Sequence, residues 1–310
     1  MNYVSAESIE KVLKYPELIE ALKTGFSNTC NVPQRAHHDY EVEGKLDSTL
    51  LMMPAWNNNA LGVKLVTVSP ENGQVGLPSI NGLYLLFNKE TGEPNALLDA
   101  KTLTNKRTAA ASALASSFLS RKDSRTLLML GTGSLAPELI MAHKAVRPIE
   151  RVLIWGRNKV KAAVIQEKFK NEFNSVEVVE TLSEEVLKSA DIVCSATLSS
   201  SPLFNGKWCT DGQHFDLVGS YRKDFREVDS DLITSSLVCV DTINALRESG
   251  DLNIPLEEEV IREKDINKDL FEMSSENQFQ RKSDKEITLF KSVGYALEDL
   301  VAAELVMKKL

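Results

Sequence analysis

Cysteine and histidine are scarce in this sequence, and neither residue type forms a recognisable cluster. The 310 residues include only four cysteines and four histidines, with no C-x-x-C and no H-x-x-x-H pair. A disulfide framework and a zinc site of the usual spacing are therefore both unexpected. Cys194 and Cys239 lie inside apolar runs, where a thiol is usually a small buried side chain. We predict no metal site and a reducing, cytosolic environment.

Positive charge and long apolar runs are lacking as well. Lys and Arg number 36 against 44 Asp and Glu, which gives a net charge of −8. An acidic chain without a basic stripe is a poor partner for nucleic acid or an anionic membrane. No apolar run approaches the roughly 20 residues of a membrane span, and the N-terminus lacks the pattern of a signal peptide. We expect a cytoplasmic globular protein with small-molecule ligands.

A glycine-rich turn near the middle of the chain is the strongest motif. The apolar run 126–130 predicts a buried parallel strand, and the hexapeptide 131–136 then reads G-x-G-x-x-A before a helical pattern. In a dinucleotide fingerprint, Gly131 permits the tight turn, Gly133 lets the backbone approach a pyrophosphate, and Ala136 lets the helix pack closely. Glycine turns between strand and helix also occur without a ligand, so the hexapeptide alone leaves both interpretations open.

The end of the next strand bears on the choice of cofactor. The apolar run 151–155 ends at Gly156, which is 25 positions after Gly131. An NAD-binding unit usually has an acid near this point to bind the ribose 2′-hydroxyl. Here Arg157, Asn158 and Lys159 follow instead, and their cations would attract a 2′-phosphate. We predict NADPH, with NADH as the alternative; a solvated helix start is the interpretation without a ligand.

The remaining elements predict an α/β fold. Residues 5–30 predict two helices capped by Ser5 and separated at Pro16. Strands are expected at 40–43, 48–53, 61–68, 83–87 and 96–99, and a helix at 102–119. After the glycine turn, strands at 176–179, 191–197, 214–219 and 237–241 alternate with helical stretches, which indicates a doubly wound parallel sheet. Residues 265–285 are polar and irregular, and a last amphipathic helix ends the chain.

Three cations in the N-terminal part have two interpretations each. Lys64 lies inside an apolar strand, where an ammonium is costly to bury unless it is paired or used. Spacing alone favours an outward-facing Lys64, because strand alternation places some charges outward. Arg35 taken alone would be an ordinary surface residue. Arg107 lies in the first turns of its helix, where the helix dipole disfavours a cation, so it needs an anionic partner.

Taken together, these segments resemble the ornithine cyclodeaminase/mu-crystallin family of nicotinamide-dependent proteins. The resemblance covers nearly the whole chain. It rests on LGVKLVT (61–67), TGEP (91–94), ALLDA (96–100), RTAAASA (107–113), GTG (131–133), PLF (202–204), GKW (206–208), LRESGD (246–251), EITLFKSVG (286–294) and ALED (296–299). It implies a central Rossmann NAD(P)-binding domain over 113–289. It also implies an α+β substrate-binding and dimerisation domain from 1–112 and 290–310, in a homodimer.

The resemblance also implies roles for individual residues. Arg35 and Lys64 match residues that hold a substrate carboxylate, and Lys64 also matches a lysine with a proton-transfer role. Arg107 matches an arginine that faces both substrate and cofactor, and Tyr221 and Val293 are expected near the substrate. The residues expected to bind the cofactor are Ser79, Arg107, Gly131, Thr132, Gly133, Ser134, Leu135, Gly156, Arg157, Asn158, Thr197, Val218, Gly219, Ser220 and Ser292.

One loop departs from the cyclodeaminating members, which have an aspartate two residues after a Val-Gly pair. Here Val218-Gly219 is followed by Ser220 and Tyr221, in a run similar to the Pro-Asp-x-Arg-Glu version of ketimine reductases, with Lys223 in place of the proline. We therefore predict an NAD(P)H-dependent reductase that converts Δ1-pyrroline-2-carboxylate, or its six-membered homologue Δ1-piperideine-2-carboxylate, to L-proline or L-pipecolate. Ornithine cyclodeaminase, alanine dehydrogenase and a non-enzymatic NADPH-dependent binding protein are the alternatives. Asp224 is a candidate substitute for the missing acid.

Overall fold

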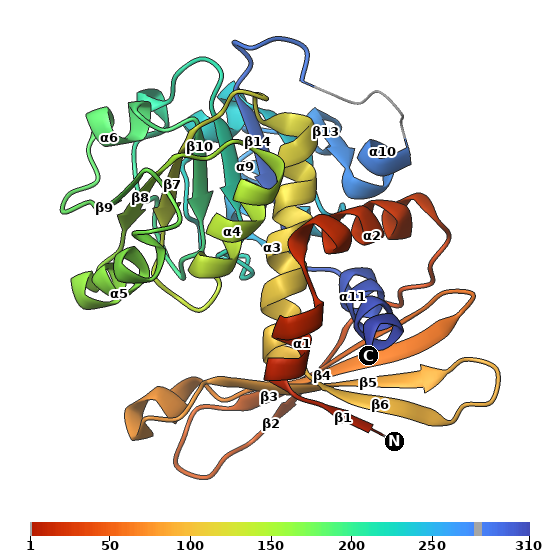
Figure 1. Ribbon diagram of the computed structural model, residues 1–310. Helices are drawn as coiled ribbons and strands as arrows, with labels where there is room; N and C mark the ends of the chain where they lie inside the picture. Colours follow the sequence, from red (N-terminus) through yellow and green to blue (C-terminus); the bar gives the residue numbers. More distant parts are fainter. Residues whose placement is uncertain (1, 276–280) are drawn as a thin grey trace. The chain divides into compact units, whose positions relative to one another are not determined.

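The computed structural model describes residues 2–275 and 281–310, which form two compact units (Figure 1). Unit 1 contains the chain up to Arg107 together with Tyr295–Leu310, and unit 2 is Thr108–Gly294. The division falls inside one long helix, α3 (Ala100–Leu119), so this helix belongs to both units.

Unit 1 is built on a six-stranded sheet with the order β1-β6-β5-β4-β3-β2, in which only the β1–β6 pair is parallel. Its strands are β1 (Asn2–Val4), β2 (Ala36–Tyr40), β3 (Ser48–Trp56), β4 (Ala60–Val68), β5 (Ile80–Asn88) and β6 (Pro94–Asp99). Its helices are α1 (Ala6–Val12), α2 (Tyr15–Ser27), the short 3-10 helix η1 (Pro70–Val75) and α11 (Ala296–Lys309).

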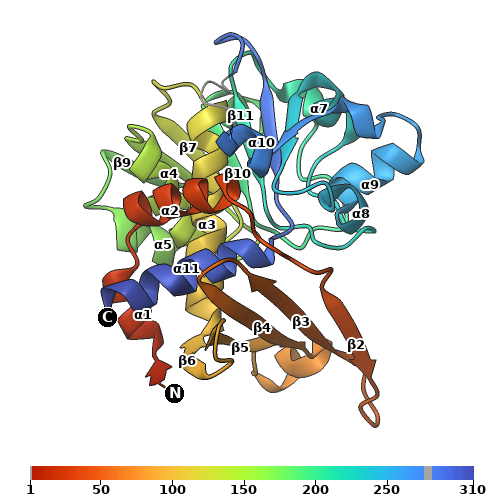
Figure 2. The same ribbon diagram turned by 90° about the vertical axis from the view of Figure 1, so that its right-hand side faces the viewer.

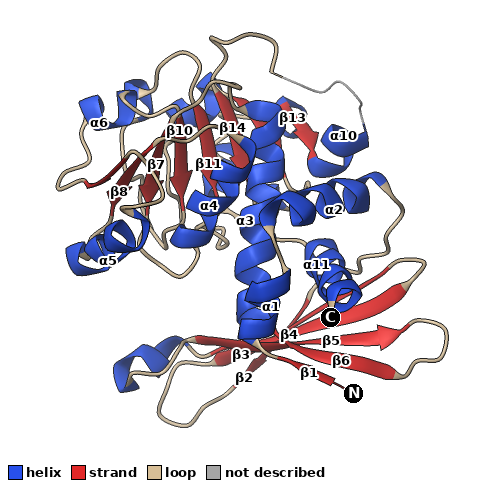
Figure 3. Cartoon of the chain, viewed as in Figure 1, coloured by secondary structure: helices blue, strands red, loops and turns tan. Residues whose placement is uncertain are grey.

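The helices of unit 1 begin as the sequence predicts, and they cover one face of the sheet. Ser5 caps α1 through the backbone N–H of Ser8, and Pro16 occupies the first turn of α2, where its missing N–H is not needed. Helix α11 packs against β3, β4 and α2 (Figure 2). Helices α1 and α11 lie over the same face of the sheet (Figure 3). The C-terminal helix therefore completes the core that the N-terminal residues begin.

Unit 2 is built on eight parallel strands in the order β13-β12-β14-β11-β10-β7-β8-β9. The strands are β7 (Thr126–Leu130), β8 (Arg151–Trp155), β9 (Ser175–Val178), β10 (Ile192–Ser195), β11 (His214–Leu217), β12 (Leu237–Val240), β13 (Ile266–Asp269) and β14 (Thr288–Lys291). The helices are α4 (Ala136–Val146), α5 (Lys159–Phe169), α6 (Glu184–Lys188), α7 (Ser230–Ser235), α8 (Ala245–Glu248), α9 (Gly250–Glu257) and α10 (Leu270–Ser275), with the 3-10 helices η2 (Gly206–Trp208) and η3 (Glu263–Asp265).

Helices pack against both faces of this sheet. Leu128, Val193 and Phe215 point to one face and form a buried core with side chains of α6, α7, α8 and α9. Side chains alternate along a strand, so Cys194 points to the opposite face, where it contacts His143 of α4. The predicted doubly wound parallel sheet is confirmed.

The structure differs from the sequence-based expectation in three segments. The strand expected at 40–43 is instead β2 at Ala36–Tyr40, because a turn closed by Lys45 and Val42 follows it. The stretch 265–285, expected to be irregular, contains β13 and α10 within its described residues. The domain boundary expected between residues 289 and 290 falls inside β14, which pairs with β11 and β12 of unit 2. Unit 2 ends instead at Gly294.

Candidate active site

Unit 1 contains two buried cations that share two buried carboxylates. Lys64 and Arg107 are 3% and 4% exposed, and Glu298 and Asp299 are fully buried. The Lys64 ammonium donates to Asp299 Oδ2 at 2.8 Å. The Arg107 guanidinium donates to Asp299 Oδ1 at 2.9 Å and to Glu298 Oε2 at 2.7 Å. We call these four residues the cation cluster.

The sheet register explains why Lys64 faces inward. In the ladder, Lys64 lies opposite Met53 of β3 and Tyr84 of β5, and directly opposed residues share one face of a sheet. Both neighbours are buried on the face that α11 covers. Asp299 lies in the first turn of α11, where the helix dipole favours a carboxylate. The outward-facing Lys64 that spacing alone favoured is therefore wrong.

The cluster pairs two cations with two carboxylates, and burial acts on the pKa values together with these charges. Burial lowers the pKa of Lys64 to about 8, helped by the Arg107 charge and opposed by Asp299. Burial alone would raise the pKa of Asp299, but Arg107 and Lys64 together hold that pKa below its usual value. The pKa of Arg107 is raised, because its two carboxylate partners outweigh burial.

The cluster still has hydrogen-bonding capacity for an anionic ligand. An ammonium has three N–H groups and a guanidinium has five. Among the described residues, Lys64 donates one N–H group to Asp299, and Arg107 donates one to each carboxylate. Further N–H groups on both cations therefore remain able to donate to a carboxylate ligand.

Arg35 belongs to the same row of the sheet, whereas Ser79 does not. Ala36 pairs with Met52, so one more step of this register places Arg35 opposite Met53, which in turn lies opposite Lys64. Arg35 is half-buried and lies two strands from Lys64, about 10 Å away by strand spacing. Ser79 precedes β5 and is five residues from the Lys64 row, about 17 Å along the strand. Its cofactor role stays a prediction.

The glycine turn of unit 2 has the geometry of a phosphate-binding loop. Gly131 has φ +115°, and a Cβ there would lie 2.6 Å from the Ala196 carbonyl oxygen, so only glycine fits. A Cβ on Gly133 would meet no atom within 4 Å, which leaves open space beside the backbone. Helix α4 then starts without a side-chain cap, so its first N–H groups can receive an anion. These residues fit the pyrophosphate of a nicotinamide dinucleotide.

The neighbours of this turn are placed as follows. Thr132 packs against Gly156, where any Cβ would lie 2.6 Å from the Thr132 methyl group. Ser134 is exposed, and Leu135 is the half-buried residue that precedes α4. Close packing of Gly156 on Thr132 therefore joins the end of β8 to the glycine turn.

At the end of β8, only one of the two predicted cations is available for a phosphate. Arg157 is exposed, and no described residue pairs with its guanidinium. Asn158 uses its side-chain oxygen to cap α5 at the N–H of Lys161. The Lys159 ammonium donates to the backbone carbonyls of Val179 and Glu180, at 2.7 Å each. Lys159 therefore stabilises the end of β9, and the expected attraction for a 2′-phosphate is reduced to Arg157.

The other predicted residues lie at the carboxyl ends of β10, β11 and β14. Thr197 follows β10, Val218 to Tyr221 follow β11, and Ser292 and Val293 follow β14. Several of these residues donate hydrogen bonds within unit 2. Thr197 and Gly219 donate to Glu227, and Ser220 donates to the Phe225 carbonyl. Ser292 and Val293 donate to Asp241. Tyr221 is 45% exposed. Parallel sheets of this kind bind ligands at this edge.

One group of described residues has ligand atoms close enough for a metal ion: His143, Cys194 and Asp216, all fully buried. The Cys194 sulfur lies 3.6 Å from both nitrogens of His143, so it is aligned with neither nitrogen's lone pair. Burial lowers the pKa of His143 to about 4 and raises the pKa of Cys194 well above its usual value. A neutral imidazole beside a protonated thiol is a polar core contact, and we assign no metal to it.

Comparison with known proteins now identifies the family. A model of the ornithine cyclodeaminase/mu-crystallin family matches residues 2–310. The chain belongs to this family. It is 40% identical over 314 residues to the Delta(1)-pyrroline-2-carboxylate reductase of Colwellia psychrerythraea, covering 100% of this chain and 99% of the relative.

Two solved structures have the same fold as this chain. The Delta(1)-pyrroline-2-carboxylate reductase of Thermococcus litoralis, in complex with NADH and L-proline, has a TM-score of 0.90 and 35% identity, covering 100% of this chain and 97% of that one. An archaeal alanine dehydrogenase dimer with bound NAD has a TM-score of 0.90 and 26% identity, covering 100% and 95%. The family and the fold class predicted from the sequence are confirmed.

In the loop after β11, Asp224 is held in an ion pair. Asp224 accepts two hydrogen bonds from Arg222, at 3.0 and 2.8 Å, and the hydrogen bonds lower its pKa. The Arg222 guanidinium also lies 4.4 Å from the centre of the Phe225 ring. Asp224 is thus bound to a neighbouring cation, which argues against its acting as the missing aspartate.

The sequence analysis did not identify the two carboxylates that pair with Lys64 and Arg107. Asp299 and Glu298 are part of a quoted motif, but no role was derived for them. Their position before the apolar stretch of a helix was an available signal, because acids favour helix N-termini. Lys291 was missed although it is a lysine at the end of the apolar strand β14, much as Lys64 is a lysine within β4. Applying the buried-lysine argument to both strands would have identified it.

We predict that Asp299→Asn destabilises the protein by about 3–5 kcal/mol, because it leaves Lys64 and Arg107 buried with one carboxylate in place of two. The free energy of unfolding from urea titration measures the effect. The control is Glu177→Gln, which breaks the partly exposed ion pair with Arg151 and should cost less than about 1 kcal/mol. Equal losses in the two variants would contradict the structural role of the cation cluster.

Proposed function

We propose that this protein is an oxidoreductase that reduces a cyclic imino acid, Δ1-pyrroline-2-carboxylate or Δ1-piperideine-2-carboxylate, to L-proline or L-pipecolate. The observation that carries the proposal is Lys64, a buried ammonium that keeps N–H groups free to bind a carboxylate. The 40% identity to a Delta(1)-pyrroline-2-carboxylate reductase supports the same substrate class. So does the 35% identity to the homologue solved with NADH and L-proline.

The cations of unit 1 bind the carboxylate of the imino acid. Charge-assisted hydrogen bonds from Lys64 and Arg107 fix its two oxygens, and such bonds are stronger than neutral ones. Arg35 is a further cation in the same row of the sheet and is the third candidate for binding this carboxylate. Fixing the carboxylate also fixes the adjacent C=N carbon, which is a proximity effect on the reaction.

The reduction adds one hydride to the carbon and one proton to the nitrogen of the C=N bond. A nicotinamide cofactor held by the glycine turn of unit 2 supplies the hydride when bound. Lys64 is the proton donor, directly or through a water molecule. With its pKa lowered to about 8 by burial, Lys64 is protonated at neutral pH and gives up its proton more readily than an exposed lysine.

The preferred cofactor of this proposal is NADPH. Arg157 is exposed at the end of β8, and no carboxylate occupies that strand end to repel a 2′-phosphate. NADH is the alternative, because the pyrroline-2-carboxylate reductase and alanine dehydrogenase homologues were solved with NADH and NAD.

Three other activities belong to the same family. Cyclodeamination of ornithine needs an acid two residues after the Val-Gly pair, and this chain has Tyr221, which carries no carboxylate, at that position. Alanine dehydrogenase activity would act on open-chain pyruvate imine with NADH. A binding protein would hold NADPH without turnover. The bidentate Arg222–Asp224 ion pair favours the reductase over the cyclodeaminase.

The assembly and location remain predictions. We propose a homodimer, supported by the alanine dehydrogenase homologue that is described as a dimer. In the described parts of the chain, no helix is both long and apolar enough to span a bilayer. The cytoplasmic location rests on sequence composition.

A spectrophotometric screen tests the function. Oxidation of NADPH at 340 nm should be clear with Δ1-pyrroline-2-carboxylate or Δ1-piperideine-2-carboxylate and absent with pyruvate plus ammonia. L-Ornithine with NAD should release no ammonia. Robust ammonia release from ornithine would establish the cyclodeaminase instead, and NADPH binding without any oxidation would establish the binding protein.

We predict that Arg157→Ala raises the KM for NADPH by roughly 10- to 150-fold, because a charged hydrogen bond to phosphate contributes about 1.5–3 kcal/mol. The KM for NADH should not change, which makes NADH the internal control. If the wild type reduces the imino acid with equal kcat/KM for both cofactors, the NADPH preference is wrong.

We predict that kcat/KM for the imino acid is constant below about pH 8 and falls about tenfold per pH unit above it, because deprotonation removes both the Lys64 charge and its proton. Lys64→Arg should abolish the fall, since arginine stays charged, while lowering kcat. Arg35→Ala is the matched control: it should raise KM and keep the same pH profile. An unchanged profile in Lys64→Arg would remove Lys64 from the titration.

A further inference from the structure

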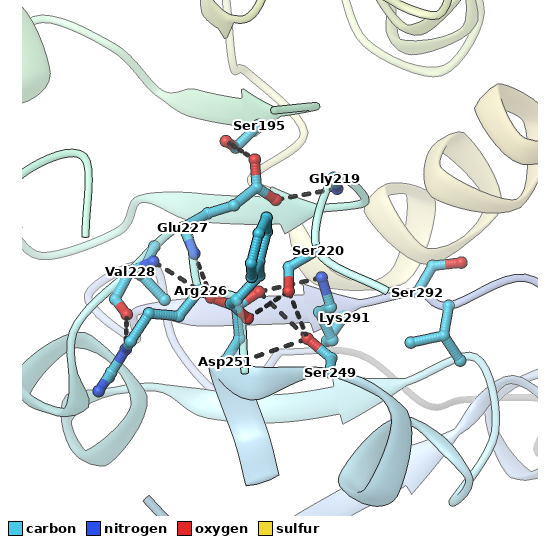
Figure 4. A network of polar contacts seen from close by, with 12 residues as sticks. Ser195, Gly219, Ser220, Arg226, Glu227, Val228, Ser249, Asp251, Lys291 and Ser292 are labelled. Atoms are coloured by element: carbon cyan, nitrogen blue, oxygen red, sulfur yellow. Dashed lines mark hydrogen bonds and ion pairs between the residues drawn. The ribbon is translucent and has the colours of Figure 1, made fainter. Parts of the chain in front are cut away.

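One fully buried carboxylate, Glu227, collects hydrogen bonds from the ends of two strands (Figure 4). Its Oε1 accepts from the Ser195 hydroxyl at 2.5 Å, and from the Thr197 N–H and hydroxyl at 2.7 Å each. Its Oε2 accepts from the Gly219 N–H at 2.9 Å. Ser195 ends β10 and Thr197 follows it, whereas Gly219 follows β11. A single side chain therefore joins the carboxyl ends of neighbouring parallel strands.

The two joined segments are in close contact. A Cβ on Gly219 would lie 2.1 Å from the Thr197 carbonyl oxygen and 2.2 Å from its nitrogen. No side chain can occupy position 219 unless the segments separate. Peptide N–H and C=O groups point in opposite directions, so the inward N–H groups of Thr197 and Gly219 turn the Ala196 and Val218 carbonyls away from Glu227.

A second layer fixes Glu227 itself. Its backbone N–H donates to Asp251 Oδ1 at 2.6 Å, and the next N–H, of Val228, donates to the same oxygen at 3.1 Å. The other oxygen of Asp251 lies 3.0 Å from the ammonium of Lys291, the last residue of β14. The position of Glu227 is thus tied to the adjacent strand by a fully buried ion pair.

The sheet order places this network beside one half of a bound dinucleotide. The order β9-β8-β7-β10-β11 reverses between β7 and β10, and dinucleotides bind across such a reversal. The pyrophosphate lies at the turn after β7, and the adenosine ribose at the end of β8. The nicotinamide half therefore lies toward the ends of β10 and β11, which Glu227 joins.

We propose that Glu227 is a positioning residue for the nicotinamide half of the cofactor. By holding two N–H groups inward, its carboxylate presents the Val218 carbonyl as an acceptor for a carboxamide, the donor group that distinguishes nicotinamide from a plain ribose phosphate, while the Ala196 carbonyl packs against Gly131. Glu227 touches neither cofactor nor substrate in this role. The inference rests on the dinucleotide site of the proposed function, and it does not depend on which imino acid is reduced.

Glu227→Gln is the sharpest test, because it changes one oxygen to an NH2 group at constant size. With the amide oxygen toward Ser195 and Thr197, the NH2 group opposes the Gly219 N–H. In the flipped amide it opposes the Thr197 N–H, because of its neighbours only the Ser195 and Thr197 hydroxyls can turn to accept. Either arrangement places a donor against a buried donor. The segment after β11 must then move while the glycine turn after β7 keeps its partners.

The experiment compares two ligands by fluorescence or calorimetric titration: NADPH and 2′-phospho-ADP-ribose, which lacks the nicotinamide. Glu227→Gln should weaken NADPH about tenfold or more, with 2′-phospho-ADP-ribose within about twofold of wild type. Gly219→Ala should give the same split through the clash with Thr197, which covers the case in which Glu227→Gln does not fold. The control Asp216→Asn changes another fully buried carboxylate, on β11, and should leave both affinities unchanged.

Equal weakening of both ligands in Glu227→Gln and Gly219→Ala would reduce Glu227 to a structural residue and overturn the inference, as would unchanged NADPH affinity. A wild type that binds neither ligand would overturn the inference together with the dinucleotide site. A wild type that shows the split but reduces no imino acid would overturn the proposed substrate and leave the role of Glu227 supported.

Discussion

The ion pair between Lys64 and Asp299 is the constraint on which unit 1 depends. A lysine inside a sheet core is tolerated only if a carboxylate lies within hydrogen-bonding distance, because an unpaired buried charge costs several kcal/mol. That carboxylate comes from the last helix of the chain, 235 residues later. The carboxylate that pairs with Lys64 therefore follows the whole of unit 2 in the sequence. This ion pair is one reason why α11 belongs to unit 1 together with the N-terminal residues.

In unit 2, buried carboxylates accept hydrogen bonds from the backbone at the carboxyl ends of the strands. Parallel strands end with backbone N–H groups that have no strand partner, and buried N–H groups need acceptors. Glu227, Asp251 and Asp241 accept from the segments after β10, β11 and β14. Lys291 places one positive charge among them, at 3.0 Å from Asp251. Buried carboxylates thus hold together the edge of the sheet where the dinucleotide is expected.

What the sequence could predict follows from the range of each interaction. The strand at 126–130 and the turn at Gly131 are local patterns, and both were predicted correctly. The inward orientation of Lys64 was not, because alternation allows either face and only its pairing with Met53 and Tyr84 decides. Strand β13 was not predicted, because it lies at the edge of the sheet and three of its four residues are polar. The partners Asp299 and Glu227 act over long sequence separations, which no spacing rule contains.

The same ion pair that stabilises unit 1 also adjusts its chemistry. An exposed lysine has a pKa of about 10.4 and holds its proton too firmly for efficient transfer near neutral pH. Burial and the Arg107 charge pull the pKa of Lys64 down, and Asp299 limits the fall so that the value is about 8. Without Asp299 the pKa of Lys64 would be lower still, and without burial it would be closer to that of an exposed lysine. The Lys64–Asp299 ion pair therefore has two effects: it offsets the cost of burying the Lys64 charge, and it adjusts the pKa at which Lys64 can give up a proton.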